Sequence, residues 1–341
     1  MIDRHLRNRY SRQTMFPPIG EEGQVKLGNS EVVIIGCGAL GSNIATFLVR
    51  AGVGKVRIVD RDFIEIHNLQ RQVLFDEDDI KAGLPKAIAA ERHLKKVNSS
   101  VEIEGIVADV NYTNIERFCS GADVILDGLD NFETRLLIND VALKLKIPWV
   151  YGGAVASNGM TMTVIPGETA CFRCVFSTLP DAGTAYTCET AGIVGTLPAV
   201  IGSLQATEAM KILVGAEPNR ELTMVDVWNG DFHRFRIERR ESCPACHGKY
   251  EFLEKTFVMK TASFCGQSRA IQVVDTGVKE IALKELAARL RNKGDVNYNE
   301  FMLRFSADGN EIIVFPDGRA IVKDTLDESQ ARELYIKYIR D

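Results

Sequence analysis

The stretch VVIIGCGALGSNIATFLVRAGVGKVRIVDRDFIEIHNLQRQ, from Val32 to Gln72, decides the fold. An apolar run leads into the pattern G-x-G-x-x-G, and a helical pattern then leads to a second apolar run that ends in an aspartate. Glycines between a strand and a helix let the backbone turn tightly and approach a pyrophosphate, and an acid about 20 residues further on can accept hydrogen bonds from a ribose. This predicts a nucleotide site, although a glycine turn that only packs a helix on a strand is the alternative. The residues expected at this site are Gly36, Gly38, Ala39, Gly41 and Asp60.

The same alternation of apolar runs and helical patterns continues along the chain, which is typical of βαβ units in a largely parallel sheet. Beyond Pro148 the apolar residues recur with a period of two, which predicts antiparallel strands, two of them joined by a turn at Asn229–Gly230. We therefore expect an α/β fold: a doubly wound, largely parallel Rossmann-like sheet with an antiparallel extension, plus a small C-terminal α+β module. The expected strands are 32–36, 56–59, 101–107 and 122–127, and the expected helices are 40–51, 85–97, 111–119, 132–146 and 197–214.

Two domains are predicted, residues 1–254 with the nucleotide motifs and residues 255–341 as an accessory module. The role of the second domain does not follow from its sequence. Its expected elements, in order, are a strand, a helix at 283–294, strands at 299–306 and 310–322 joined by a turn at Asp308–Gly309, and a helix at 327–339.

Composition and charge exclude several classes of protein. The chain has 341 residues and 45% hydrophobic content, enough for a full α/β core, and its net charge of -5 argues against a general nucleic-acid or membrane-surface binder. The N-terminus lacks the apolar core of a secretory signal, and glycines and a proline interrupt the longest uncharged run, 190–207, so no membrane span is expected. These features predict a cytoplasmic protein, in which eight cysteines favour metal ligands, reactive thiols or core residues over disulfides.

Charged residues in several motifs favour ATP over a dinucleotide. Arg12, Arg71 and Lys86 supply fixed cations, and Asp130 ends another predicted parallel strand, where side chains face the ligand crevice of an open sheet. A triphosphate with its magnesium ion needs this mixture of cations and a carboxylate. Each residue alone is better explained as a solvated surface charge, whereas together they favour ATP and Mg²⁺.

The motifs RYSRQ, GCGALG, AGVG, IVDRDFIEIHNLQRQ, PKA, LDGLDNFETR and TCETAG, with two Cys-x-x-Cys pairs, occur in this order over residues 8 to 250. In this they resemble the ubiquitin-activating superfamily, and most closely its bacterial MoeB/ThiF branch, the adenylyltransferases of molybdopterin and thiazole biosynthesis. The resemblance implies a homodimer that adenylates the C-terminal glycine of a small ubiquitin-like sulfur-carrier protein ending in Gly-Gly. The sequence leaves open whether that carrier is MoaD-like or ThiS-like.

The resemblance also implies site residues by position. Asp130, followed by Asn131, would hold magnesium, and Arg12 would reach across from the partner subunit as an arginine finger. A peptide carboxylate has a pKa of about 3.5 and needs no general base, so catalysis is expected from positioning and preset cations. The residues implied at the ribose are Asp60 and its neighbour Asp62, and those implied at the phosphates are Asn68, Arg71 and Lys86.

Two Cys-x-x-Cys pairs, Cys171/Cys174 and Cys243/Cys246, predict a metal site. Each pair alone also fits a redox dithiol or two ordinary cysteines. Two pairs together can complete a closed tetrahedral Cys₄ zinc site, and the resemblance places zinc ligands at these four positions. We therefore expect a structural zinc ion.

Cys188, in AYTCETAG, falls at the position of the family's sulfur-handling or thioester-forming cysteine. A thiolate near a helix N-terminus can have a lowered pKa and attack an acyl-adenylate or carry a persulfide. An idle loop thiol is the alternative. A cysteine desulfurase or a rhodanese is the candidate sulfur donor.

Two other classes of function remain open. A nucleotide-binding oxidoreductase agrees with the glycine loop but leaves Arg12, Arg71, Asp130 and the paired cysteines without a role. A non-catalytic carrier-binding scaffold would predict damaged ATP-site residues, and none is damaged.

Overall fold

The computed structural model describes residues 8–176, 188–254, 270–273, 281–325 and 327–340. The chain divides into two compact units, Met1–Phe257 and Val258–Asp341, and each is described by itself. The predicted domain boundary after residue 254 stays a prediction, because residues 255–269 lie outside the described part of the chain.

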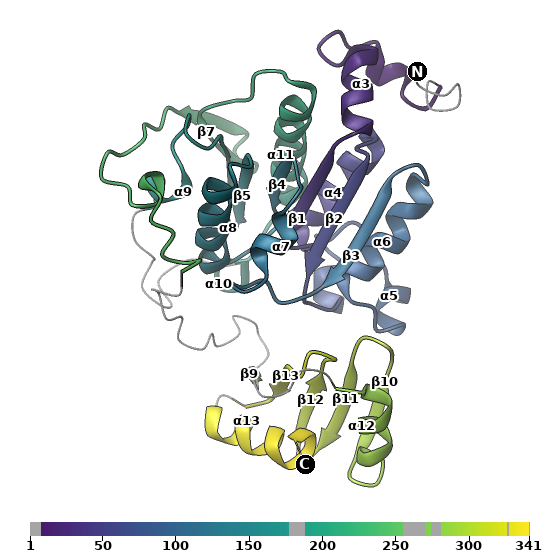
Figure 1. The fold of residues 1–341 in the computed structure, drawn as a ribbon. Coiled ribbons are helices and arrows are strands. Elements are labelled where there is room, and N and C mark those ends of the chain that lie inside the picture. Colours follow the sequence, from purple (N-terminus) through teal and green to yellow (C-terminus); the bar gives the residue numbers. More distant parts are fainter. Residues whose placement is uncertain (1–7, 177–187, 255–269, 274–280, 326, 341) are drawn as a thin grey trace. The chain divides into compact units, whose positions relative to one another are not determined.

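An eight-stranded sheet in the order β3-β2-β1-β4-β5-β6-β7-β8 forms the centre of the first unit (Figure 1). Strands β1 to β5 run parallel, and β6, β7 and β8 are added in antiparallel fashion. The predicted doubly wound fold class with an antiparallel extension is therefore confirmed. The strands are β1 (Glu31–Ile35), β2 (Lys55–Asp60), β3 (Glu102–Val107), β4 (Val124–Asp127), β5 (Trp149–Val155), β6 (Asn158–Val164), β7 (Leu222–Asp226) and β8 (Asp231–Phe235).

Helices cover both faces of this sheet. Successive residues of β1 alternate between two cores: Val33 and Ile35 pack with α7 and α8, while Ile34 faces the start of α4. All are fully buried, as expected for parallel strands covered on both sides. The longer helices are α3 (Gly20–Gly28), α4 (Ala39–Ala51), α6 (Lys86–Val97), α8 (Phe132–Leu145) and α11 (Leu197–Val214), and the shorter ones are α2 (Ser11–Thr14), η1 (Ile66–Asn68), α5 (Glu77–Lys81), α7 (Ile115–Cys119), α9 (Phe172–Val175), α10 (Cys188–Ala191) and η2 (Ala245–His247).

Helix α11 packs on α4 and on strands β4, β5 and β6. Among the described helices it alone is long and apolar enough to cross a membrane, and half of it is buried inside the fold. Core helices pass the same test of length and composition. Its packing agrees with the buried helix expected from the sequence.

The strand order reverses between β1 and β4, and the backbones that follow these two strands lie almost in contact. A Cβ atom on Gly128 would lie 2.1 Å from the carbonyl oxygen of Gly36, and a Cβ atom on Gly41 would lie 2.0 Å from the same oxygen. Only glycine fits at these positions. Open α/β sheets bind ligands at such a switch point, outside the carboxyl ends of the strands.

The second unit contains an antiparallel five-stranded sheet in the order β10-β11-β12-β13-β9, with its own apolar core. Two expectations are corrected here. The segment 310–322 forms two strands because a turn at Asp317–Gly318 divides it, and the strand β10 was not predicted. The elements are β9 (Ala270–Val273), α12 (Leu283–Leu290), β10 (Asp295–Tyr298), β11 (Leu303–Ala307), β12 (Asn310–Val314), β13 (Ala320–Lys323), α13 (Glu328–Tyr335) and η3 (Ile336–Arg340).

Candidate active site

The glycine loop joins β1 to α4 at the switch point. Gly36 adopts a φ of +90°, which favours glycine, and α4 begins at Ala39 with Gly38 as its N-cap. A Cβ built on Gly38 would lie 3.8 Å from the side-chain nitrogen of Gln72 and from the carbonyl oxygen of Gly128, which is ordinary van der Waals contact. Such a loop can bring backbone N–H groups and the helix N-terminus close to a phosphate.

Asp60, Asp62 and Lys86 lie together beside this loop. The buried carboxylate of Asp60 accepts hydrogen bonds from the backbone N–H groups of Cys37 (2.6 Å) and Asp62 (2.7 Å). Lys86, the first residue of α6, is also buried, and its ammonium donates to the carboxylate of Asp62 at 3.2 Å. The carboxyl end of β2 and the start of α6 thereby place two acids and one cation at the crevice.

Electrostatics in this cluster keep the lysine charged. Burial alone would lower the pKa of Lys86, but the carboxylates of Asp62, Asp60 and Asp130 outweigh this effect and raise the pKa above its usual value. Burial raises the pKa of Asp60, and the ammonium of Lys86 opposes that shift. Burial also raises the pKa of the Cys37 thiol, so this cysteine is neutral and packs in the core.

Asp130 and Asn131 lie where β4 leads into α8. Asp130 is exposed, and its effect on Lys86 places both residues at the same crevice. Asn131 is the N-cap of α8, and its side-chain oxygen accepts a hydrogen bond from the backbone N–H of Thr134 at 2.9 Å. The structure gives Asn131 a capping role and leaves the Asp130 carboxylate open to solvent.

Two predicted phosphate ligands, Asn68 and Arg71, and the predicted arginine finger Arg12 make only local contacts among the described residues. Asn68 is buried and accepts a hydrogen bond from the N–H of Glu65, while the guanidinium of Arg71 donates to the carbonyl of His67 at 2.9 Å. Arg12 contacts the sulfur of Met15 at 3.6 Å and forms no ion pair within the described ranges. Their predicted contacts with ATP stay predictions.

Three buried polar residues near the crevice were not singled out from the sequence. Gln72 lies beside Gly38, and its side-chain oxygen has no hydrogen-bond partner among the described residues. Asp127 and Arg135 form a buried ion pair, with 2.9 Å between Oδ2 and Nε. All three occur within the motifs HNLQRQ and LDGLDNFETR. The residue types in these motifs do not show which side chains point into the protein.

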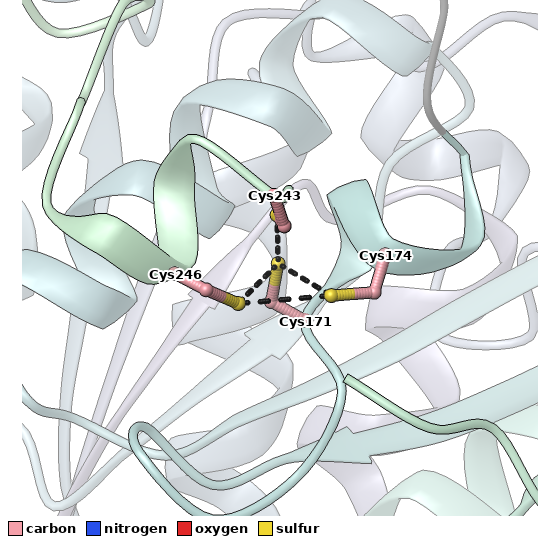
Figure 2. A group of neighbouring side chains, drawn as sticks. All are labelled: Cys171, Cys174, Cys243 and Cys246. Carbon is pink, nitrogen blue, oxygen red and sulfur yellow. Dashed lines mark hydrogen bonds between the residues drawn. The ribbon is translucent and has the colours of Figure 1, made fainter. Parts of the chain in front are cut away.

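The four paired cysteines converge on one point (Figure 2). Sulfur–sulfur distances are 3.8 Å within the first pair and 3.5 to 3.6 Å between the pairs. A tetrahedron with zinc–sulfur bonds of about 2.3 Å has sulfur–sulfur edges of about 3.8 Å, so the arrangement fits a zinc ion. The ligands of this Cys₄ cluster are Cys171, Cys174, Cys243 and Cys246.

The sulfur atoms alter one another's acidity. The hydrogen bond between Cys171 and Cys246 is the main cause that lowers the pKa of Cys246 to about 5, while the same hydrogen bond and burial raise the pKa of Cys171. Thiols that share one small volume cannot all ionise without a compensating cation. A divalent metal ion would supply that compensation.

Helix α8 holds the two halves of the Cys₄ cluster in place. The side-chain oxygen of Asn139 accepts the N–H of Phe172 at 2.9 Å, and the carboxylate of Asp140 accepts the N–H of Phe252 at 2.9 Å. Both side chains are fully buried. The helix that begins after Asp130 and Asn131 therefore also supports the Cys₄ cluster.

Cys188 is the first residue of α10. Its side chain and residues 177–187 lie outside the described part of the structure. The predicted sulfur-handling role stays a prediction.

A switch-point glycine loop, a lysine that nearby acids keep charged and a Cys₄ cluster that could hold a metal together indicate a nucleotide-binding α/β protein. The model of the ThiF family matches residues 10–245, and the chain belongs to this family. The predicted resemblance to the ubiquitin-activating superfamily is thereby confirmed.

Known proteins resemble the chain to different extents. The sulfur carrier protein ThiS adenylyltransferase of Bacillus subtilis is 43% identical over 98% of this chain and 100% of its own length. The Escherichia coli protein of the same name is 37% identical over 70% of this chain and 95% of its own length. Among solved structures, Escherichia coli MccB with ATP is 26% identical, with a TM-score of 0.61 over 70% of this chain and 75% of that one.

Proposed function

We propose that this protein is an enzyme that uses ATP to adenylate the C-terminal glycine of a ubiquitin-like sulfur carrier and releases pyrophosphate. The observation that carries the proposal is Lys86, a buried lysine that nearby carboxylates keep charged beside the glycine loop at the switch point. The two bacterial relatives are adenylyltransferases of sulfur carriers by name, which agrees with this reaction. The carrier is proposed to end in Gly-Gly.

The carrier's terminal carboxylate would attack the α-phosphorus of ATP and form an acyl-adenylate. The bond between the α-phosphorus and the bridging oxygen would break, and pyrophosphate would leave with the electron pair. Since the attacking carboxylate is already ionised at neutral pH, the site needs no general base. Lys86 and Arg71 would offset the negative charge that accumulates on the leaving group.

Asp130 is proposed to hold Mg²⁺ with the triphosphate. Its carboxylate is exposed at the crevice, and carboxylate oxygens are preferred ligands of this ion. A bound magnesium ion would neutralise part of the phosphate charge. Asp60 and Asp62 are proposed to bind the ribose, and Asn68 the phosphates.

A zinc ion in the Cys₄ cluster is proposed to have a structural role. The four sulfurs form a closed set of ligands and leave no position for a substrate. Zinc would fasten α9, which follows β6, to η2 near the end of the first unit.

The protein is proposed to act as a homodimer. A groove of about 370 Å³ lies between α4 and α11 and is lined by Gln13, Phe47 and Met210, among others. Phe47 is 39% exposed. Met15 and Phe16, which follow Arg12 closely in the sequence, are exposed as well. A second copy that covered this face would bury these apolar side chains and bring its Arg12 towards the crevice, as the resemblance implies.

A ThiS-like carrier is the better candidate for the substrate, and thiazole synthesis for the pathway. The relative that aligns with nearly the whole chain, including most of the second unit, carries that name. A MoaD-like carrier of molybdopterin synthesis is the alternative.

Cys188 is proposed to accept or pass on sulfur after adenylation. The proposed sulfur donor is a cysteine desulfurase or a rhodanese, and the proposed location of the reaction is the cytoplasm.

Mass spectrometry of the carrier tests this proposal. The protein, ATP and Mg²⁺ are incubated with a ThiS-like carrier and, separately, with a MoaD-like carrier. We expect an adenylate adduct on the carrier's C-terminus, formed faster with the ThiS-like protein. Adduct on the MoaD-like protein alone would reverse the assignment of the pathway, and no adduct on either would remove the proposed substrate class.

A further inference from the structure

The guanidinium of Arg135 contacts three segments of the chain near the carboxyl end of β4. Its Nε donates to the carboxylate of Asp127 at 2.9 Å, and its Nη2 donates to the backbone carbonyls of Leu129 (2.5 Å) and Gly152 (2.8 Å). These acceptors belong to the end of β4, to the loop before α8 and to β5. One side chain thereby ties two strands and the loop between β4 and α8 together.

Asp127 also holds the loop between β4 and α8. The second carboxylate oxygen of Asp127 accepts the backbone N–H of Leu129 at 2.9 Å. Leu129 therefore has both its N–H and its carbonyl engaged by the pair of Asp127 and Arg135. The residue that follows it is Asp130, the proposed magnesium ligand.

Burial makes this arrangement specific for arginine. The side chains of Arg135 and Asp127 are 6% and 0% exposed. A planar guanidinium can serve a carboxylate and two carbonyls at fixed angles, whereas the single ammonium of a lysine cannot reach the same three acceptors in the same geometry. The aromatic ring of Tyr151, with its centroid 5.2 Å from the Arg135 guanidinium carbon, further restricts the side chain.

We infer that Arg135, through Asp127 and the backbone of Leu129, is a positioning residue that fixes the Asp130 carboxylate for the metal–nucleotide complex. The inference rests on the proposed role of Asp130. Arg135 itself touches no reacting atom in this account. Its loss is expected to weaken metal binding while the fold remains.

The test is the affinity of Mn²⁺, used as a spectroscopic substitute for Mg²⁺, for the full-length protein saturated with a non-hydrolysable ATP analogue. Electron paramagnetic resonance measures the free Mn²⁺. We expect Arg135→Lys to weaken Mn²⁺ binding about 10- to 100-fold, the range typical of residues that support a metal ligand. The Mg²⁺ concentration for half-maximal ATP–pyrophosphate exchange should rise by a similar factor.

Arg57→Lys is the matched control. Arg57 also binds a carboxylate, that of Glu31, and the carbonyl of Phe118, but it lies in the middle of β2, away from Asp130. Mn²⁺ affinity within twofold of the wild type in Arg135→Lys, or an equal loss in Arg57→Lys, would overturn the inference. If Arg135→Lys does not fold, Asp127→Asn, which keeps the side-chain shape, carries the same test and the same expected loss.

The proposed function and the positioning role of Arg135 can be contradicted by different results. Wild-type protein that binds the Mn²⁺–nucleotide complex but adenylates no carrier would count against the proposed function and leave the positioning role measurable. Normal adenylation with an unchanged metal requirement in Arg135→Lys would count against the positioning role alone.

Discussion

The buried ammonium of Lys86 lies 3.2 Å from the partly exposed carboxylate of Asp62, and the buried carboxylate of Asp60 belongs to the same cluster. Because these acids keep the lysine charged, the crevice holds a fixed cation before any nucleotide arrives. The phosphate groups of a bound nucleoside triphosphate would interact with this cation. The pair is therefore the part of the structure most directly suited to adenylyl transfer.

Lys86→Ala should reduce ATP–pyrophosphate exchange by roughly 10²- to 10³-fold, because the variant loses a preset cation for the developing charge. Lys81→Ala is the control, since the side chain of Lys81 is 71% exposed and, within the described part of the chain, pairs only with Asp78 in a short surface helix. The control should exchange at the wild-type rate. Equal rates in both variants would remove Lys86 from the catalytic machinery.

Arg12→Ala should keep the fold and lose most adenylation, and its activity should return on mixing with Lys86→Ala. In a mixed dimer, the site with an intact Lys86 receives the intact Arg12 of the other subunit. Random mixing should restore about a quarter of the wild-type rate, because half of the dimers are mixed and each has one complete site. The measurement is exchange by co-expressed variants, and no recovery would place Arg12 in its own subunit's site or outside it.

Arg71→Ala should also lose most adenylation while the fold remains. The guanidinium of Arg71 bonds only to the backbone carbonyl of His67 among the residues described, so its removal disrupts no ion pair. ATP–pyrophosphate exchange and thermal unfolding, measured together, check this. Unchanged turnover would exclude Arg71 from the phosphate site.

Cys243→Ser should abolish binding of one zinc ion per chain and destabilise the region of the Cys₄ cluster. Structural zinc contributes on the order of 10 kcal/mol to folding. Cys119→Ser, which alters a buried cysteine outside the cluster, should retain the metal. The measurement is the zinc content of the purified proteins. Wild-type protein that lacks zinc, or Cys243→Ser protein that retains it, would contradict the assignment of a zinc site.

Asp140 should make stability depend on pH. Burial raises the pKa of this carboxyl to about 6, whereas the unfolded value is about 3.9. Between these values the folded protein binds more protons than the unfolded chain, so the contribution of this residue to stability falls as pH rises. From about pH 5 to about pH 7 the loss should be on the order of 1 kcal/mol.

Urea unfolding of the wild type and of Asp140→Asn measures this effect as a difference. The amide does not titrate, so the stability of the wild type relative to the variant should decrease across that interval. Other groups, including the cysteines, affect both proteins alike. A constant difference would show that Asp140 does not titrate with the expected pKa.

The first unit could be predicted closely because local patterns agree with its tertiary structure. The predicted helix at 40–51 is α4, Ala39–Ala51, and the strand at 56–59 lies within β2. In the second unit the pattern was weaker. The run at 310–322 is apolar on both sides of its turn, and β10 has the sequence DVNY, whose polar residues give little strand signal on their own.

The sequence could place residues in the fold where a motif fixes the backbone, but it could not show side-chain direction. The roles of these residues in the site stay predictions. Gly36, Asp60 and Lys86 occupy the crevice because they end a strand or begin a helix. Nothing in the sequence distinguishes the buried Asp127 from the exposed Asp130, three residues later. That distinction comes from the ion pair with Arg135, which forms only when α8 packs against the sheet.

The most direct test of the central claim is ATP–pyrophosphate exchange with Mg²⁺ and a ThiS-like carrier, compared with the same carrier lacking its terminal glycine. Exchange reports reversible formation of the acyl-adenylate. We predict exchange that requires the intact carrier and disappears with the shortened one. No exchange with the intact carrier, despite measurable ATP binding, would contradict the account.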